Sequence, residues 1–99
     1  MEVAEEYSVK VDRIILFGSR ARGDFRVNSD WDILIVTKEK LDWKIQNRFL
    51  GDVEKKLVYS GIVPEIIIVD QETFKKYKRP AYVFYHAEKE GILIKWSKM

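Results

Sequence analysis

The stretch "FGSRARGDFRVNSDWDILIV", residues 17–36, decides the fold and the chemistry that the sequence predicts. It joins a Gly-Ser pair to two aspartates, Asp30 and Asp32, at the head of an apolar run. Residues two apart in a strand point to the same face, so the two carboxylates should lie side by side. Such carboxylates repel each other unless a cation lies between them. The pair therefore predicts a Mg²⁺ site, with an ion-paired surface as the alternative.

The Gly-Ser turn upstream has the features of a phosphate-binding loop. Gly18 lets the backbone approach a ligand closely, and the Ser19 hydroxyl can donate to a phosphate oxygen. Backbone N–H groups in such a turn, together with the start of a short helix, bind anions. Arg20 and Arg22 add planar guanidinium donors. A phosphate-binding turn beside a metal-binding acidic pair is the combination that nucleotidyl transfer requires.

The flanking sequence predicts an α/β domain, a small mixed β-sheet with helices packed on it. Apolar runs predict strands over residues 13–17, 31–36, 62–69 and 92–96, the last at a sheet edge. Helices are predicted over residues 2–9, 70–77 and 80–90. A further helix carries an apolar stripe that begins at Leu41, continues through Ile45, Phe49 and Val53 to Leu57, and ends at Gly61.

Length and composition set limits on the class of protein. The 99 residues suffice for one domain, residues 1–99, and 46% hydrophobic residues argue against disorder. The sequence contains no cysteine, which excludes a disulfide framework and a thiolate metal site. The net charge of 18 − 16 = +2 does not indicate nucleic-acid binding, and the basic run at residues 75–79 fits a solvated face or an acidic or nucleotide-bearing partner. No apolar run predicts a membrane span or signal peptide, so we expect a cytoplasmic protein.

Two spaced motifs carry a resemblance to a known family. The string G-S-x-x-x-G at residues 18–23, followed by S-D-x-D at residues 29–32, resembles the signature of DNA-polymerase-β-type nucleotidyltransferases. The small size and the closing "VFYHAEKEGILI", residues 83–94, resemble the minimal, MntA-like nucleotidyltransferases that pair with HEPN-domain proteins in prokaryotic toxin–antitoxin systems. The resemblance covers nearly the whole chain and implies a polymerase-β-like nucleotidyltransferase fold.

The resemblance also implies a third acidic residue on the following strand. Glu65 in "PEIIIV" is the candidate, whereas Asp70, five residues on, would point to the opposite face. The family usually has Asp at this position, so Glu65 is a departure that adds one methylene. By resemblance, Asp30 and Asp32 hold two Mg²⁺ ions, and Glu65 holds the ion that activates the acceptor hydroxyl.

The function implied by the resemblance is transfer of AMP from ATP to a hydroxyl of a HEPN-domain partner, with the chain acting as antitoxin. The alternative is a non-catalytic antitoxin that neutralises its partner by contact. A third hypothesis is transfer to a small molecule or a nucleic acid. A domain of 99 residues leaves little room for an acceptor-binding domain, so a partner or a second copy would supply the selectivity.

Overall fold

The computed structural model describes residues 7, 9–23, 30–76 and 89–96. The helices predicted over residues 2–9 and 80–90 lie almost entirely outside these ranges, as does the second half of the basic run. No helix in the described part of the chain is long and apolar enough to cross a membrane.

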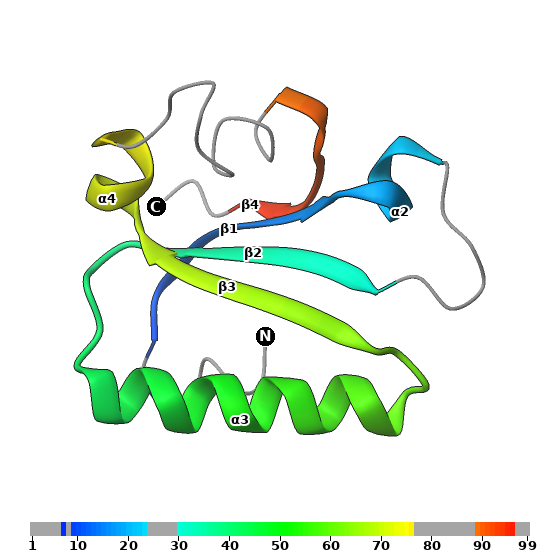
Figure 1. Ribbon diagram of the computed structural model, residues 1–99. Coiled ribbons are helices and arrows are strands. Elements are labelled where there is room, and N and C mark those ends of the chain that lie inside the picture. The colour runs from blue at the N-terminus through cyan, green and yellow to red at the C-terminus, as the bar shows by residue number, and fades with distance from the viewer. Residues whose placement is uncertain (1–6, 8, 24–29, 77–88, 97–99) are drawn as a thin grey trace.

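In the part of the chain that the structure describes, four strands form one mixed sheet, which confirms the predicted fold class. The strands are β1 (Val11–Phe17), β2 (Trp31–Thr37), β3 (Pro64–Asp70) and β4 (Ile92–Trp96). Their order is β3-β2-β1-β4, so β4 lies at an edge as predicted (Figure 1). β1 pairs antiparallel with both β2 and β4, whereas β2 and β3 are parallel. Parallel strands start at the same end of a sheet, and the predicted acidic residues lie at the starts of β2 and β3.

Helix α3 (Trp43–Tyr59) connects the two parallel strands and covers one face of the sheet (Figure 1). The helix begins at Trp43, because the side chain of Asp42 accepts the backbone N–H of Lys44 and so caps the helix. Leu41, predicted as the first helical residue, therefore packs against the core from the preceding loop. Phe49 and Val53 are buried, and Leu57 packs against the cluster to which they belong. Ile45 is 39% exposed, so the predicted stripe faces the core at every position except this one.

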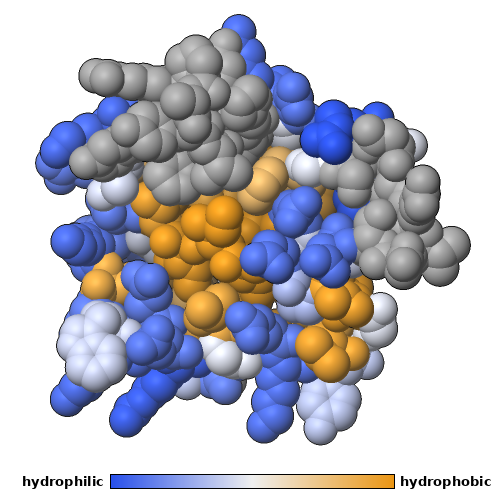
Figure 2. Space-filling view, in the orientation of Figure 1, coloured by the Kyte–Doolittle hydropathy of each residue, from blue (hydrophilic) through white to orange (hydrophobic). Residues whose placement is uncertain are grey.

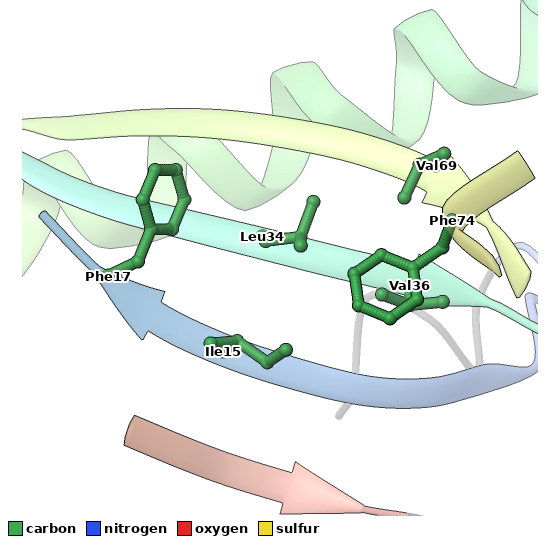
Figure 3. Packing of buried hydrophobic residues seen from close by; sticks show 6 residues of the cluster. All are labelled: Ile15, Phe17, Leu34, Val36, Val69 and Phe74. Carbon is green, nitrogen blue, oxygen red and sulfur yellow. The ribbon is translucent and has the colours of Figure 1, made fainter. Parts of the chain in front are cut away.

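A second hydrophobic cluster covers the opposite face of the sheet, beneath helix α4 (Gln71–Lys76). Its buried members are Ile15, Phe17, Leu34, Val36, Val69 and Phe74. Figure 3 shows these six side chains on one side of the sheet, with α3 on the other. Strands β1, β2 and β3 thus contribute every second residue to this face. Asp32, two residues before Leu34, therefore lies on the same face at the start of β2.

The free side of β3 is the second edge of the sheet in the described part of the chain. Hydrophobic residues gather above α3 near the centre of the view in Figure 2. Ile66, Ile67 and Ile68 are each only half-buried at this edge. The predicted start of the strand at residue 62 is two residues early, since β3 begins at Pro64.

Asp70 ends β3 and caps α4. Its Oδ2 accepts the Thr73 backbone N–H at 3.0 Å, and its Oδ1 accepts the Thr73 hydroxyl at 2.7 Å. Burial acts to raise the pKa of Asp70, but the hydrogen bonds from Thr73 outweigh it and the pKa is lowered. In the structure, Asp70 therefore serves as a helix cap, at the opposite end of β3 from Glu65.

We expect Asp70→Ala to lower the free energy of unfolding by about 1 kcal/mol at neutral pH, because α4 loses its cap. A carboxylate with a lowered pKa stabilises the fold above its unfolded value of about 3.9, and this contribution disappears as the pH falls through the folded pKa. Urea unfolding of both proteins at neutral and acidic pH measures the difference. If the difference in free energy of unfolding between the wild-type chain and Asp70→Ala were the same at neutral and acidic pH, the capping role of the Asp70 carboxylate would be contradicted.

Candidate active site

The strand register brings Asp32 and Glu65 together at the start of two parallel strands. Asp32 lies directly opposite Glu65 on β3 and opposite Phe17 on β1. Opposed residues of adjacent strands share a face and lie about 5 Å apart. The two carboxylates therefore lie on the face of the Phe17 cluster, where Ile67 and Val69 also lie, as the alternation of β3 predicts.

Asp30 lies one residue before β2 and is exposed. The next residue, Trp31, donates its backbone N–H to the Val63 carbonyl at 2.9 Å, which holds the entry of β2 against the approach to β3. Glu65, two residues after Val63, is also exposed, whereas Asp32 is half-buried. The acidic group thus has one shielded carboxylate between two that face solvent.

Electrostatic interactions join the three carboxylates. Burial raises the pKa of Asp32, and the negative charges of Glu65 and Asp30 raise it further, while Arg22 acts in the opposite direction. As placed, no three His, Cys, Asp or Glu side chains among the described residues gather closely enough to hold a metal ion. The site has the negative charge and the hard oxygen donors that a cation site uses, but the three carboxylates do not converge as placed.

Gly18 forms the turn between β1 and helix α2 (Ser19–Arg22), and it lies directly against Asp32. Its φ of +74° is in the left-handed region that favours glycine. A Cβ at this position would overlap Asp32 Oδ2 and lie 3.0 Å from Asp32 Cγ. The Gly18 carbonyl accepts the N–H groups of Ala21 and Arg22, both at 3.1 Å, which begins the helix. The predicted phosphate-binding turn is thus in contact with the acidic strand.

The two predicted phosphate-binding arginines lie in different surroundings. Arg20 stacks over the ring of Trp31, with its Cζ atom 4.5 Å from the ring centroid. Trp31 alternates with Asp32 and so belongs to the α3 face of the sheet. Arg22 acts electrostatically on Asp32, and its Nη1 lies 3.9 Å from Glu90 Oε2. The guanidinium group of Arg22 is therefore associated electrostatically with the Asp32 carboxylate.

Sequence reasoning missed two of these partners. Strand alternation predicts only that Trp31 faces away from the carboxylates, whereas in the structure it is half-buried beneath Arg20. Glu90 was not singled out at all, because it approaches Arg22 only once β4 has paired with β1. No local spacing in the sequence marks either contact.

Comparison with known proteins assigns the family. A family model described as "Polymerase beta, Nucleotidyltransferase" matches residues 1–97. A Methanocaldococcus jannaschii protein, MJ0604, provisionally named a protein adenylyltransferase, is 39% identical over 71 residues. That match covers 72% of this chain and 66% of the relative, so the chain spans just under two thirds of the relative's length.

Two solved structures share the fold. One is a toxin–antitoxin complex with AMP-PNP, with a TM-score of 0.60 and 20% identity, covering 98% of this chain and 70% of that chain. The other is a tri-AMPylated Shewanella oneidensis HEPN toxin in complex with its MNT antitoxin, with a TM-score of 0.56 and 15% identity, covering 98% of this chain and 66% of that chain. From the match over residues 1–97 and this shared fold, we conclude that the chain belongs to the polymerase β nucleotidyltransferase family.

Proposed function

We propose that this chain is a Mg²⁺-dependent nucleotidyltransferase that moves AMP from ATP to a hydroxyl group of a partner protein. The observation that carries the proposal is the position of Asp32. Its carboxylate lies against Gly18 of the phosphate-binding turn and opposite Glu65 across the parallel strands. A nucleotide held by the turn would thus present its phosphates to the acidic group.

The donor set fits a magnesium ion. Asp30, Asp32 and Glu65 offer only carboxylate oxygens. Burial raises the pKa of Asp32, the charges of Glu65 and Asp30 raise it further, and a bound cation would relieve that repulsion. These three residues would hold one or two ions. When bound, Mg²⁺ polarises the phosphate oxygens and lowers the pKa of the attacking hydroxyl.

The chain's own groups account for the remaining steps. The Gly18–Ser19 turn and Arg22 hold the triphosphate and offset its negative charge. The acceptor oxygen attacks the α-phosphorus, and the bond from that phosphorus to the bridging oxygen of the β-phosphate breaks. Pyrophosphate leaves, and the hydroxyl proton passes to Glu65, which faces solvent and is open to an incoming acceptor. AMP remains esterified to the acceptor.

We propose a HEPN-domain protein in the cytoplasm as the partner and ATP as the donor. The name of the Methanocaldococcus jannaschii relative and the toxin–antitoxin neighbours support this choice. The exposed position of Glu65 supports a macromolecular acceptor, because no described element closes over it. A tyrosine hydroxyl is the acceptor we expect.

The proposal is tested with the protein encoded beside this chain. The two proteins are incubated with ATP and Mg²⁺, and intact-mass spectrometry is run on the partner. We expect a mass increase equal to one or more AMP groups, localised to a hydroxyl side chain. The control is a chain with Asp30→Asn and Asp32→Asn, which should leave the partner unmodified. An unmodified partner with the wild-type chain, although the two proteins bind, would contradict the proposal.

A second candidate function is neutralisation of the partner by contact alone. The observation that favours it is that the three carboxylates do not converge on one point as placed. In that case the Asp30→Asn, Asp32→Asn chain should restore the growth of cells that express the partner as well as the wild-type chain does. Loss of that rescue assigns neutralisation to the acidic site.

Glu65 provides a separate prediction. Glu65→Gln should lower the rate of pyrophosphate release about a hundredfold or more, because it removes a metal-binding charge and the proton acceptor. Glu65→Asp keeps the charge and should retain much more activity than Glu65→Gln. Glu72→Gln, an exposed change on α4, is the matched control and should be neutral. A Glu65→Gln enzyme with the wild-type rate would remove Glu65 from the site.

A further inference from the structure

One short segment contacts the head of β2 from both faces of the sheet. On the face of the acidic group, Gly18 lies against the Asp32 carboxylate. On the α3 face, Arg20 stacks on Trp31 with 4.5 Å between Cζ and the ring centroid. Because Trp31 and Asp32 are consecutive strand residues, the segment that begins at Gly18 holds both sides of the strand that carries the acidic group.

The Arg20–Trp31 contact is close and partly shielded from water. Trp presents the most favourable face for a cation among the aromatic side chains, and Arg can stack on it in parallel. Arg20 Nε is buried, and Trp31 is half-buried. The described part of the chain holds a useful contrast at the start of α3, where Lys44 Nζ lies 5.8 Å from the ring centroid of Trp43, a residue that is 67% exposed.

We infer that Arg20 and Trp31 are positioning residues whose stack fixes the phosphate-binding turn relative to Asp30 and Asp32. Arg20 holds no phosphate in this arrangement, because its guanidinium group lies over a ring on the opposite face from the acidic group. The phosphate-binding role that the sequence suggested for both arginines falls to Arg22 alone. The inference rests on the proposed nucleotidyl transfer and assigns parts within that site.

The two roles for Arg20 have different kinetic consequences. Loss of a phosphate ligand weakens nucleotide binding and raises KM for ATP. Loss of a positioning contact leaves the phosphate contacts in place but displaces them relative to the carboxylates, and a displacement of about 1 Å can lower a rate about a hundredfold. The stack therefore acts on kcat more than on KM.

A double-mutant cycle on kcat and KM tests the inference, with Arg20→Met, Trp31→Leu and the double variant. We expect each single change to lower kcat about tenfold to a hundredfold with KM for ATP little changed. The double variant should be no slower than the slower single variant, since both changes remove one contact. Trp31→Phe keeps an aromatic face and should recover most of the rate.

Two outcomes would overturn the inference. One is a raised KM in Arg20→Met together with wild-type kcat in Trp31→Leu, which makes Arg20 a phosphate ligand. The other is a double variant in which the two decreases in kcat multiply, because the two side chains would then act independently. The paired changes Lys44→Met and Trp43→Leu remove the exposed cation–ring contact on α3 and should leave kcat unchanged. Thermal unfolding of each variant shows that it is folded. If Trp31→Leu does not fold, Trp31→Met replaces it in the cycle, because that change also removes the aromatic face.

Failure of the proposed function gives a different result. If the wild-type chain transfers no AMP to any acceptor, nucleotidyl transfer is wrong. The Arg20–Trp31 stack is then judged from the free energies of unfolding of the same four chains. If the changes in free energy of unfolding were additive, the two side chains would not be coupled, and the inference would be wrong.

Discussion

Asp32→Asn should lower the rate of AMP transfer about a thousandfold while leaving the protein folded. The variant loses a charged oxygen donor between Gly18 and Glu65, and the metal-assisted stabilisation that depends on it amounts to several kcal/mol of the barrier. The neutral amide keeps the shape of the side chain, so its contact with Gly18 survives. Initial rates of pyrophosphate release measure the effect.

The same substitution should not destabilise the fold. Burial, Glu65 and Asp30 raise the pKa of Asp32, so its charged form is less favourable in the folded chain than in the unfolded chain. At neutral pH, Asp32→Asn removes that unfavourable charge, and we expect an equal or higher Tm. A variant that loses activity and also unfolds at a lower temperature would mean that Asp32 serves the fold and would contradict this account.

Gly18→Ala has the second largest expected effect. The new Cβ would overlap the Asp32 carboxylate and displace it, and the φ of +74° disfavours any residue with a side chain. We expect a loss of about 1 to 2 kcal/mol in the free energy of unfolding from the backbone conformation alone. Displacement of Asp32 should add a fall of about a hundredfold in the transfer rate.

Gly61→Ala separates these two effects. Gly61 ends α3 with a φ of +83°, and a Cβ there would meet no atom within 4 Å. The change should cost a similar free energy of unfolding, about 1 to 2 kcal/mol, and leave the rate per folded molecule unchanged. If Gly18→Ala and Gly61→Ala had the same rate, the contact between Gly18 and Asp32 would have no role in transfer.

Much of this arrangement can be predicted because it follows from local rules. Alternation along a strand correctly separates Asp32 from Trp31 and groups Glu65 with Ile67 and Val69. Short apolar runs located all four strands within two residues of their ends. Gly61 ends α3 as its conformational freedom predicts, with its N–H donating to the Val58 carbonyl at 3.0 Å.

The remainder depends on contacts that no local pattern encodes. α3 begins at Trp43, two residues after the predicted start at Leu41, because Asp42 caps the helix and Leu41 lies in the preceding loop. The difference between Arg20 and Arg22 arises because the two residues are two positions apart in a single helical turn, about 200° around the axis of α2. A sequence shows only two similar guanidinium groups. Likewise, the direct contact between Gly18 and Asp32 follows from the register that places Phe17 opposite Asp32.

The central claim is that this chain transfers a nucleoside monophosphate. The most direct measurement compares ATP labelled at the α-phosphate with ATP labelled at the γ-phosphate, each incubated with Mg²⁺, the purified chain and the purified protein encoded beside it. We predict that a protein band acquires label from α-labelled ATP only, that the γ label appears in pyrophosphate, and that Asp32→Asn abolishes both signals. Label from γ-labelled ATP on the protein would mean phosphoryl transfer, and equal α-labelling by Asp32→Asn would mean that the acidic group does not catalyse transfer; either result contradicts the account.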